Sequence, residues 1–191
     1  YIKEYTLRGH LLFEGEYLNG KRNGKGKKYD KNFGCLLFEG EYFNGKRNGK
    51  GREYGGCKEI IFEGEYRNGL RHGKGVEYYE YNILKSEGEY RKGIKNGKWK
   101  EYYKNGLLKM EGEYKEGIKN GKGKEYYDDG LLKMEVEYLL GIGKGKEYFD
   151  NGKIKFEGEY KNDLKWNGKG YDPSENNIVY ELKNGKGYVK E

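Results

Sequence analysis

Residues 38–54 read Phe-Glu-Gly-Glu-Tyr-Phe-Asn-Gly-Lys-Arg-Asn-Gly-Lys-Gly-Arg-Glu-Tyr, and close copies of this stretch recur along the whole chain. The first glutamate of each copy follows the previous one after 25, 24, 24, 24, 24 and 22 residues, at Glu14, Glu39, Glu63, Glu87, Glu111, Glu135 and Glu157. So regular a repeat indicates a stack of small units, each in contact with its neighbours. It also argues against an enzyme, because a catalytic site needs a constellation that occurs once, and we predict no catalytic residues.

The composition favours a folded protein with a polar surface. Hydrophobic residues make up 34% of the 191 residues and charged residues 37%, with a net charge of +7. The 22 tyrosines argue against disorder, because disordered segments are poor in aromatic residues. No apolar run approaches the roughly 20 residues that a membrane-spanning helix needs. We therefore expect a cytoplasmic protein, with peripheral attachment to a membrane or a cytoskeletal structure as the alternative.

Cysteine and histidine are too rare to suggest a disulfide framework or a metal site. Cys35 and Cys57 stand at different positions within their repeats. We expect two free thiols in a reducing compartment. His10 and His72 lie far apart in the sequence and lack ligand partners, so we expect neither a metal nor a cofactor.

One repeat reads as two β-strands, because residues 86–90 and 97–103 alternate with period two. Asn105-Gly106 is a strong signal for a two-residue hairpin turn. That turn predicts five opposite pairs: Tyr103–Leu108, Lys100–Glu111, Trp99–Gly112, Lys98–Glu113 and Gly97–Tyr114. A four-residue loop over positions 92–95 would set four more: Gly97–Tyr90, Lys98–Glu89, Trp99–Gly88 and Lys100–Glu87.

Both registers give the sheet two different faces. Glu–Lys ladders run along one face, and aromatic rings lie beside glycines on the other. Cross-strand pairs of these kinds contribute about 0.2–1 kcal/mol each. A Gly112→Val replacement is then expected to hinder the packing of Trp99. Four glutamates fall on the aromatic side in this register, where we expect them to line the rim: Glu77, Glu101, Glu125 and Glu147.

The predicted fold is all-β: an elongated, single-layer antiparallel β-hairpin repeat of about 24 residues and two strands per unit, twisted into a trough. The expected single array over residues 1–191 has a partial repeat at 1–13, repeats from 14, 39, 63, 87, 111, 135 and 157, and an atypical cap at 171–191. The sixth unit is irregular, with Val136 in place of glycine and a short loop at 139–142. This irregularity fits either local drift or a bend or docking point. Because the sequence begins inside a repeat, we expect more protein upstream.

The aromatic side is the candidate partner-binding surface, although most of its rings are expected to form the core of the sheet. Tyrosine and tryptophan are typical of binding hot spots, and a single layer leaves some apolar surface exposed. An amphipathic helix or extended peptide is the expected partner. The candidate residues from first strands are Tyr17, Tyr42, Tyr66, Tyr90, Tyr114, Tyr138 and Tyr160. Those assigned to second strands are Tyr79, Trp99, Tyr103, Tyr127 and Phe149.

Acidic lipid is the second candidate partner, through basic residues that cluster at one kind of turn: Lys21, Arg22, Lys46, Arg47 and Arg71. The interleaved acidic residues dilute this charge. Nucleic acid is not expected, because the glutamate ladders would repel phosphate. Exposed sheet edges would allow self-association.

The repeat resembles the MORN repeat (membrane occupation and recognition nexus) through Phe38-Glu-Gly-Glu-Tyr42, Asn44-Gly45 and Asn48-Gly49-Lys50-Gly51. Arg71-His72-Gly73-Lys74-Gly75 comes closest to that family's His-Gly-x-Gly form, whereas Asn replaces His in most units. The resemblance covers the chain from about Lys3 to Lys190. The doubled tyrosines and the Asn-Gly-Leu-Leu-Lys-Met links are also similar to a bacterial MORN variant described as an antitoxin. The resemblance implies a non-enzymatic scaffold or docking groove for protein segments, with acidic phospholipid binding or a role as an accessory domain as alternatives.

Overall fold

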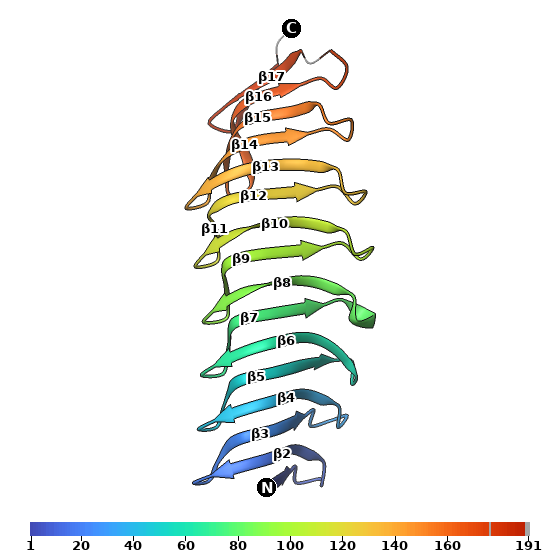
Figure 1. Ribbon diagram of the computed structural model, residues 1–191, viewed down its shortest axis with the longest axis vertical. Helices are drawn as coiled ribbons and strands as arrows, with labels where there is room; N and C mark the ends of the chain where they lie inside the picture. Colours follow the sequence, from blue (N-terminus) through green and yellow to red (C-terminus); the bar gives the residue numbers. More distant parts are fainter. Residues whose placement is uncertain (176, 190–191) are drawn as a thin grey trace. The chain divides into compact units, whose positions relative to one another are not determined.

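The computed structural model describes residues 1–175 and 177–189, and the chain divides into two compact units, Tyr1–Ile94 and Lys95–Glu191. In each unit consecutive strands pair antiparallel, which gives a single-layer sheet of hairpins (Figure 1). The predicted all-β hairpin-repeat fold is confirmed. The single array over 1–191 stays a prediction, and residues 176, 190 and 191 of its expected cap lie outside the described residues.

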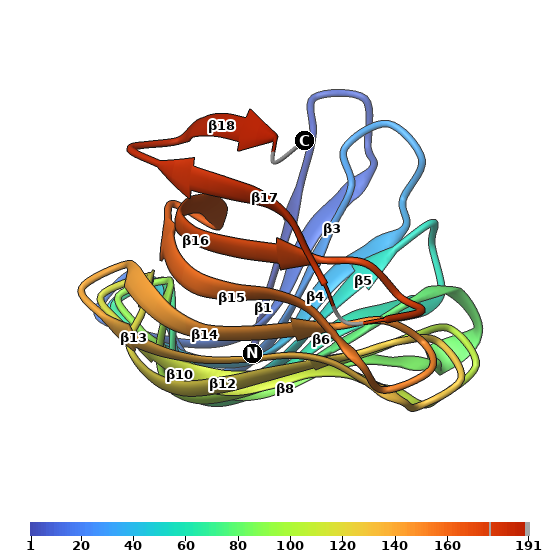
Figure 2. The same cartoon turned by 90° about the horizontal axis from the view of Figure 1, so that it is seen from above.

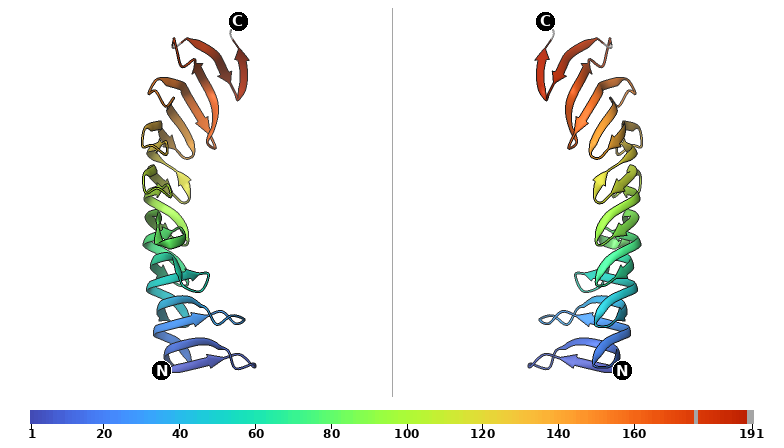
Figure 3. Two further views of the ribbon diagram at one scale, coloured as in Figure 1. Left: turned by 90° about the vertical axis from the view of Figure 1, so that its right-hand side faces the viewer. Right: turned by 90° about the vertical axis from the view of Figure 1, so that its left-hand side faces the viewer.

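The elements of the first unit are β1 (Ile2–Tyr5), β2 (Leu11–Leu18), β3 (Lys21–Tyr29), β4 (Leu36–Phe43), β5 (Lys46–Gly55), β6 (Glu59–Arg67), β7 (Leu70–Tyr78), the 3₁₀-helix η1 (Glu80–Asn82) and β8 (Leu84–Arg91). Those of the second unit are β9 (Ile94–Tyr102), β10 (Leu108–Lys115), β11 (Ile118–Lys119), β12 (Gly121–Tyr126), β13 (Leu132–Leu139), β14 (Ile142–Tyr148), β15 (Ile154–Lys161), β16 (Leu164–Tyr171), β17 (Ile178–Lys183) and β18 (Lys186–Val189). Strand β9 begins on the last residue of the first unit. Figures 2 and 3 show the strands of the second unit turning progressively towards β18.

The centre of the β9–β10 hairpin has the predicted register. Four predicted pairs are confirmed: Lys100–Glu111, Trp99–Gly112, Lys98–Glu113 and Gly97–Tyr114. In the first unit Lys27 likewise lies between Glu14 and Glu39. Because opposite residues share a face of the sheet, these charges form one side, here called the ladder face, and the rings form the other, the aromatic face.

Ion pairs on the ladder face are largely exposed. The Nζ atom of Lys27 lies 3.9 Å from Glu39, and Nε of Arg52 lies 3.1 Å from Glu63. Exposed pairs of this kind contribute about 0–1 kcal/mol each. The ladders therefore act more on the register, because a one-residue slip would move every charge to the aromatic face.

The predicted turn at Asn105-Gly106 is wrong in length. Leu108 pairs with Tyr102 instead of Tyr103, and the register shifts next to it. The Tyr103 N–H donates to the Leu107 carbonyl at 2.9 Å, and the Gly106 N–H donates to the Tyr103 carbonyl at 2.9 Å. Only Gly106, at φ 85°, has a positive φ, whereas the predicted turn needs two such residues. The Asn105 side chain instead accepts the Leu107 N–H at 3.0 Å, which stabilises a three-residue loop.

The two-residue turn lies at the opposite end of the hairpins, where a four-residue loop was predicted. Lys92 and Gly93 have φ 53° and 84°, as do the equivalent Asn44 and Gly45 at 49° and 84°. A bulge follows this turn, because Tyr42 pairs with Arg47 while Gly40 pairs with Gly51. The prediction missed the bulge because a four-residue loop without a bulge gives the same pairs at the centre of the hairpin as a two-residue turn with a bulge.

The bulge connects each turn to the next one. The carbonyl of Arg47 accepts the Gly69 N–H at 2.8 Å, and the side chain of Asn48 accepts the Asn68 N–H at 3.4 Å. The Asn that replaces the family's His in most units is therefore an acceptor for the following turn. Equivalent bonds recur in both units, at Asn23, Asn96 and Asn167.

The irregular sixth unit lacks this bulge. Tyr138 pairs with Gly143 and Leu139 with Ile142, without any shift, so the missing bulge accounts for the 22-residue spacing. Asp163 in the next turn instead reaches past this hairpin to Lys119, with Oδ1 and Nζ 2.8 Å apart. The short loop is therefore a local change of geometry within the second unit.

The two adjacent tyrosines at the end of a second strand donate hydrogen bonds to different neighbours, one in the hairpin before and one in the hairpin after. In the second unit, the hydroxyl of Tyr126 donates to the ladder carboxylate of Glu111 at 3.1 Å. The hydroxyl of the adjacent Tyr127 donates to the carbonyl of Tyr148 in the following hairpin at 2.7 Å. The first tyrosine therefore fixes the ladder face, and the second fixes the spacing of the loops.

Fully buried phenylalanine rings lie on glycines of the sheet. Four rings have 0% exposure: Phe13, Phe38, Phe62 and Phe156. A Cβ added to Gly26 would overlap the Phe13 ring, and one added to Gly75 would lie 2.6 Å from the Phe62 ring. The idea that glycine makes room for a ring is supported in the first unit, with phenylalanine rather than tyrosine as the ring.

The same idea is wrong for Gly112. The nearest atoms to a Cβ added there are Gly123 Cα at 3.4 Å and the Lys122 carbonyl oxygen at 3.6 Å, both at ordinary contact distances. No atom of Trp99 lies within 4 Å of that position. Met110 stands where other hairpins carry phenylalanine, so no ring covers the glycine of this hairpin.

The two cysteines form a disulfide, with Cα atoms 4.5 Å apart, so the expectation of free thiols is wrong. Cys35 lies in the loop between β3 and β4, and Cys57 in the loop between β5 and β6. Both loops lie at the same ends of the strands. Counted between equivalent residue pairs of the flanking strands, the loop that contains Cys35 is one residue longer than the loop that contains Cys57. Positions within the repeat therefore do not show which loop residues lie next to each other.

We predict that Gly75→Ala lowers the free energy of unfolding by about 1–3 kcal/mol, because the added methyl group overlaps the Phe62 ring. Gly112→Ala, where the methyl group fits, should change it by less than about 0.5 kcal/mol. Denaturant unfolding of both variants measures the difference. Equal effects at the two glycines would contradict the ring-on-glycine packing.

We predict that the Cys35–Cys57 bond stabilises the first unit. It closes a loop with a sequence separation of 22, for which chain entropy gives about 3 kcal/mol. Reduction with dithiothreitol should therefore lower the melting temperature of the oxidised protein. The matched double variant Cys35→Ser, Cys57→Ser should melt at that lower temperature with or without the reductant.

Candidate functional site

The aromatic face of the first unit carries a continuous row of rings. Phenylalanine and tyrosine alternate in edge-to-face contacts, with centroids 5.2–5.8 Å apart and interplanar angles of 77–89°. The order along the row is Tyr17, Phe13, Tyr42, Phe38, Tyr66, Phe62 and Tyr90. Such pairs contribute about 0.5–1.5 kcal/mol beyond the burial of their area. Each phenylalanine contacts tyrosines of two hairpins, so the row connects successive repeats.

A guanidinium group covers each phenylalanine of this row. The Cζ atoms of Arg22, Arg47 and Arg71 lie 4.0, 4.1 and 3.8 Å from the centroids of the Phe13, Phe38 and Phe62 rings. The bulge after the turn places these arginines, because it sets Arg47 opposite Tyr42 and therefore on the aromatic face. Each phenylalanine is packed between glycine backbone on one side and a cation on the other.

Carboxylates on the same face pair with these cations. Glu53 accepts hydrogen bonds from Nη1 of Arg47 and Nη2 of Arg71, both at 2.7 Å, and from the Tyr66 hydroxyl at 2.9 Å. Burial alone would raise the pKa of Glu53, but the hydrogen bond and charge of Arg71, with Tyr66 and Arg47, outweigh it and hold the pKa below the ordinary 4.5. Glu53 is therefore a charged group, held in place by three donors.

The glutamates expected at the rim belong to the same series. Glu77 bonds to Arg71 at 2.7 Å, Glu101 to Lys95 at 2.6 Å, and Glu147 to Lys165 at 2.7 Å. Glu125 lies 3.5 Å from Lys119. They lie on the aromatic face, as the register predicted, but they are half-buried or buried. Ion pairing on that face explains why their burial does not contradict the register.

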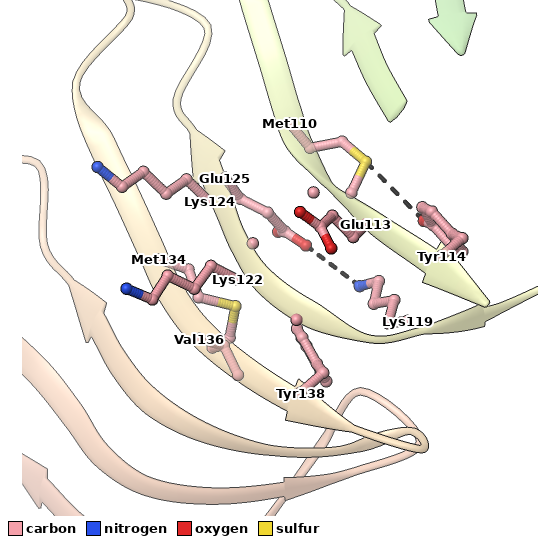
Figure 4. A pocket seen from close by; sticks show the side chains of 13 residues that line it. Met110, Glu113, Tyr114, Lys119, Lys122, Lys124, Glu125, Met134, Val136 and Tyr138 are labelled. Carbon is pink, nitrogen blue, oxygen red and sulfur yellow. Dashed lines mark hydrogen bonds and ion pairs between the residues drawn. The ribbon is translucent and has the colours of Figure 1, made fainter. Parts of the chain in front are cut away.

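The aromatic face of the second unit contains a depression where phenylalanine is missing. Met110 and Met134 stand at the phenylalanine positions, and Val136 lies beside them (Figure 4). The depression encloses about 10 Å³, which is room for about one water molecule. Tyr114 and Tyr138 also line it, together with the charged groups Lys119 and Glu125 (Figure 4). Methionine is flexible and packs against varied shapes, so this part of the face can adapt to a partner.

The structure places the twelve candidate aromatic residues in two groups. Six are buried: Tyr42, Tyr66, Tyr90, Trp99, Tyr138 and Tyr160. The other six are half-buried: Tyr17, Tyr79, Tyr103, Tyr114, Tyr127 and Phe149. The assignment of Tyr79, Tyr103, Tyr127 and Phe149 to second strands is wrong, because each follows the last residue of its strand and lies in the loop. Of the residues assigned to second strands, Trp99 does lie within one, β9.

The five basic residues proposed for lipid contact also fall into two groups. Lys21 and Lys46 are exposed beside the two-residue turns. Arg22, Arg47 and Arg71 lie on the aromatic face, where each forms an ion pair at 2.7 Å. A place at the same turn therefore does not mean the same exposure, because the bulge turns the second cation of each turn inward.

Sequence reasoning missed the buried phenylalanines and the cations that cover the face. A constant spacing could have revealed them. A cation stands five residues after the tyrosine of most repeats, at Arg22, Arg47, Arg71, Lys95, Lys119 and Lys165. A glutamate follows six residues after the cation at Glu53, Glu77, Glu101 and Glu125. This linked spacing indicates an ion pair within each hairpin.

The described part of the chain brings together no group of three His, Cys, Asp or Glu side chains that could hold a metal ion. Within residues 1–175 and 177–189, no helix has the length and hydropathy of a membrane-spanning segment.

We predict that Glu53→Gln lowers the free energy of unfolding by about 1–3 kcal/mol at neutral pH, because it weakens charge-assisted bonds to two arginines. The pKa of Glu53 is lower in the folded protein, so its contribution is present above 4.5 and is lost as the pH falls through the folded-state pKa. The difference between wild type and variant should therefore shrink in acid. Glu63→Gln on the exposed ladder face should change the stability by less than about 0.5 kcal/mol. A difference that does not depend on pH would contradict this account.

The comparisons with known proteins agree with the repeated geometry. The model of the MORN repeat matches residues 13–34, 38–56, 62–80, 87–107 and 111–131, which together make up just over half of the chain. No curated protein matches the chain. The matched segments contain the phenylalanine, glycine, tyrosine and arginine residues that build the aromatic face of the first unit. This chain belongs to the MORN repeat family.

Proposed function

We propose that this chain is a non-catalytic scaffold that binds a segment of another protein, an amphipathic helix or an extended peptide, along the aromatic face. MORN repeats in general form a non-enzymatic module that mediates interactions with proteins or membranes. The contact residues of this chain in the second unit are the half-buried rings Tyr103, Tyr114, Tyr127 and Phe149.

The methionine-lined depression of the second unit is the observation that carries the proposal. In the first unit, phenylalanine rings and arginines fill the aromatic face. In the second unit, Met110 and Met134 replace those rings, and the added Cβ positions at Gly112 and Gly123 meet no atom closer than 3.4 Å. An apolar side chain of a partner can displace these methionine side chains with little loss of packing, because methionine is flexible and can adopt another conformation.

The charges around the depression favour a partner of mixed character. Burial alone would lower the pKa of Lys119, but Asp163, the nearby Tyr138 and Glu125 outweigh it and raise that pKa above the ordinary 10.5. Lys119 is therefore charged at neutral pH. An amphipathic segment can place apolar side chains on the methionines and an acidic one near Lys119.

Membrane binding remains the second candidate, and its support is narrower. Lys21 and Lys46 are exposed, but the ion pairs of Arg22, Arg47 and Arg71 reduce the charge available for anionic headgroups. A role as accessory domain of a longer protein is compatible with either partner.

A photo-crosslinking amino acid at Met134 tests the proposal. On the aromatic face it should capture one protein partner at a defined ratio in an extract of the source cells. The matched control is the same amino acid at Lys146, which lies on the ladder face between Glu135 and Glu157, does not line the depression and should capture none.

Flotation with phosphatidylserine vesicles separates the alternative. Crosslinking from Lys146 but not from Met134 would contradict the aromatic face as the binding surface. Salt-sensitive flotation without any crosslinked protein would favour the membrane instead.

A further inference from the structure

A carboxylate lies between successive arginines of the first unit, and its geometry follows a rule. Arg71 donates Nη1 to Glu77 and Nη2 to Glu53, each at 2.7 Å. Arg47 donates its own Nη1 to Glu53 at 2.7 Å. Glu53 is thus held by Nη1 of the arginine before it and by Nη2 of the arginine after it, whereas Glu77 has an arginine only before it and is held by Nη1 of that arginine. The carboxylate of Glu53 occupies the gap between Arg47 and Arg71.

The gap between Arg22 and Arg47 lacks its carboxylate. The position that corresponds to Glu53 is Lys28, which pairs with Phe13 and Phe38 as Glu53 pairs with Phe38 and Phe62. Arg22 binds Glu4 through Nε and Nη2, at 2.9 and 2.7 Å. Within the described residues, Nη1 of Arg22 and Nη2 of Arg47 have no carboxylate, and these are the two donors that the rule assigns to this gap.

A buried hydroxyl in the same gap also lacks its acceptor. Tyr66 donates to Glu53 at 2.9 Å and Tyr90 donates to Glu77 at 3.0 Å. The equivalent tyrosine, Tyr42, is 5% exposed, and its hydroxyl makes no hydrogen bond to any described residue. Burial raises the pKa of Tyr42. The nearby charges of Arg47 and Arg22 and an interaction of the Arg47 side chain with the hydroxyl oppose that rise, but the hydroxyl has no acceptor for its own proton.

Among the described residues, two other buried tyrosine hydroxyls lack a hydrogen-bond partner, those of Tyr17 and Tyr160. Their hairpins do contain the carboxylate, because Arg22 holds Glu4 and Lys155 and Lys165 hold Glu147. The gap at Lys28 therefore combines two arginines without their second partner, an unsatisfied hydroxyl and an exposed lysine in place of the acid.

We propose that Arg22, Arg47 and Tyr42 form a binding site for a carboxylate supplied by another molecule, the side chain of a glutamate or aspartate in an acidic peptide segment. The site is accessible, since 26% and 25% of the Arg22 and Arg47 side chains are exposed and Lys28 is exposed at its margin. The bound carboxylate completes the series that Glu53 and Glu77 continue.

A carboxylate fits this gap better than a larger anion. The chain itself fills the equivalent gap with a glutamate, held by two guanidinium donors and one hydroxyl at 2.7–2.9 Å. Arginine pairs with carboxylates through parallel N–H donors, and such charge-assisted bonds are the strong ones. The identity of the ligand as a peptide rests on the proposed function, whereas the empty carboxylate position does not.

Hexaglutamate with blocked ends tests the site, with hexaglutamine as the neutral control. The side-chain Nε–Hε signals of Arg22 and Arg47 are followed by NMR during the titration, and both should shift with hexaglutamate alone. Lys28→Glu supplies the missing carboxylate from within the chain. It should weaken hexaglutamate binding by at least about tenfold and raise the melting temperature by about 2–4 °C.

Two matched variants separate site filling from general charge. Lys46→Glu makes the same charge change at an exposed turn and should weaken binding by less than about threefold, the effect of long-range charge alone. Lys28→Ala leaves the gap open and should likewise retain binding within about threefold. Equal affinities of Lys28→Glu and Lys46→Glu, or unshifted arginine signals, would overturn the proposal.

A third measurement follows binding of the protein to phosphatidylserine vesicles. Vesicle binding that Lys28→Glu abolishes, without any binding of hexaglutamate, would assign the site to a lipid headgroup and overturn the peptide assignment. Crosslinking of a protein partner from Met134 without hexaglutamate binding would leave the proposed function standing and would reject this site.

Discussion

The contact on which the structure depends is a phenylalanine ring between glycine backbone and a guanidinium group. A single-layer sheet has no second layer to cover its apolar residues, and this arrangement buries a large ring within the layer's own side chains. Glycine below Phe62, at Gly64 and Gly75, brings the ring down to the backbone, and Arg71 above it excludes water. The cation can lie there because Glu53 and Glu77 neutralise it. Fold and electrostatics on the aromatic face therefore have one cause.

The two faces then serve different purposes. On the ladder face the charges are exposed and their ion pairs contribute little to stability, so their main effect is to disfavour a shifted register. On the aromatic face the charges are half-buried and each has a fixed partner, so the replacement of one residue leaves donors without an acceptor. Lys28 on the aromatic face therefore leaves arginine donors without their carboxylate. Val76 replaces a ladder lysine between Glu63 and Glu87, and this change on the exposed face has no comparable effect.

The sequence repeat predicts the strands, the central register and the two faces, because alternation and pairing are local and recur in every unit. The turns were predicted less well. Asn105-Gly106 has the composition of a two-residue turn, but the Asn side chain stabilises a longer one, and the bulge after Asn44-Gly45 depends on a bond to the next turn. The disulfide between Cys35 and Cys57 was missed because loop positions do not follow strand counting. The aromatic candidates within strands share one face, whereas Tyr79, Tyr103, Tyr127 and Phe149 lie in loops. Burial on that face depends on the cations, which the hydrophobic pattern does not include.

The bulge after each two-residue turn has a consequence for how such arrays vary. It adds two residues, an even number, so its loss in the sixth hairpin leaves every later side chain on its original face. The extra residue behind the 25-residue step lies in the loop after Tyr29, at the opposite edge, where side-chain alternation no longer applies. The repeats can therefore differ in length by two residues at the ends with the two-residue turns, and by any number of residues in the loops at the opposite ends of the strands. Neither change moves a side chain of the strands to the other face.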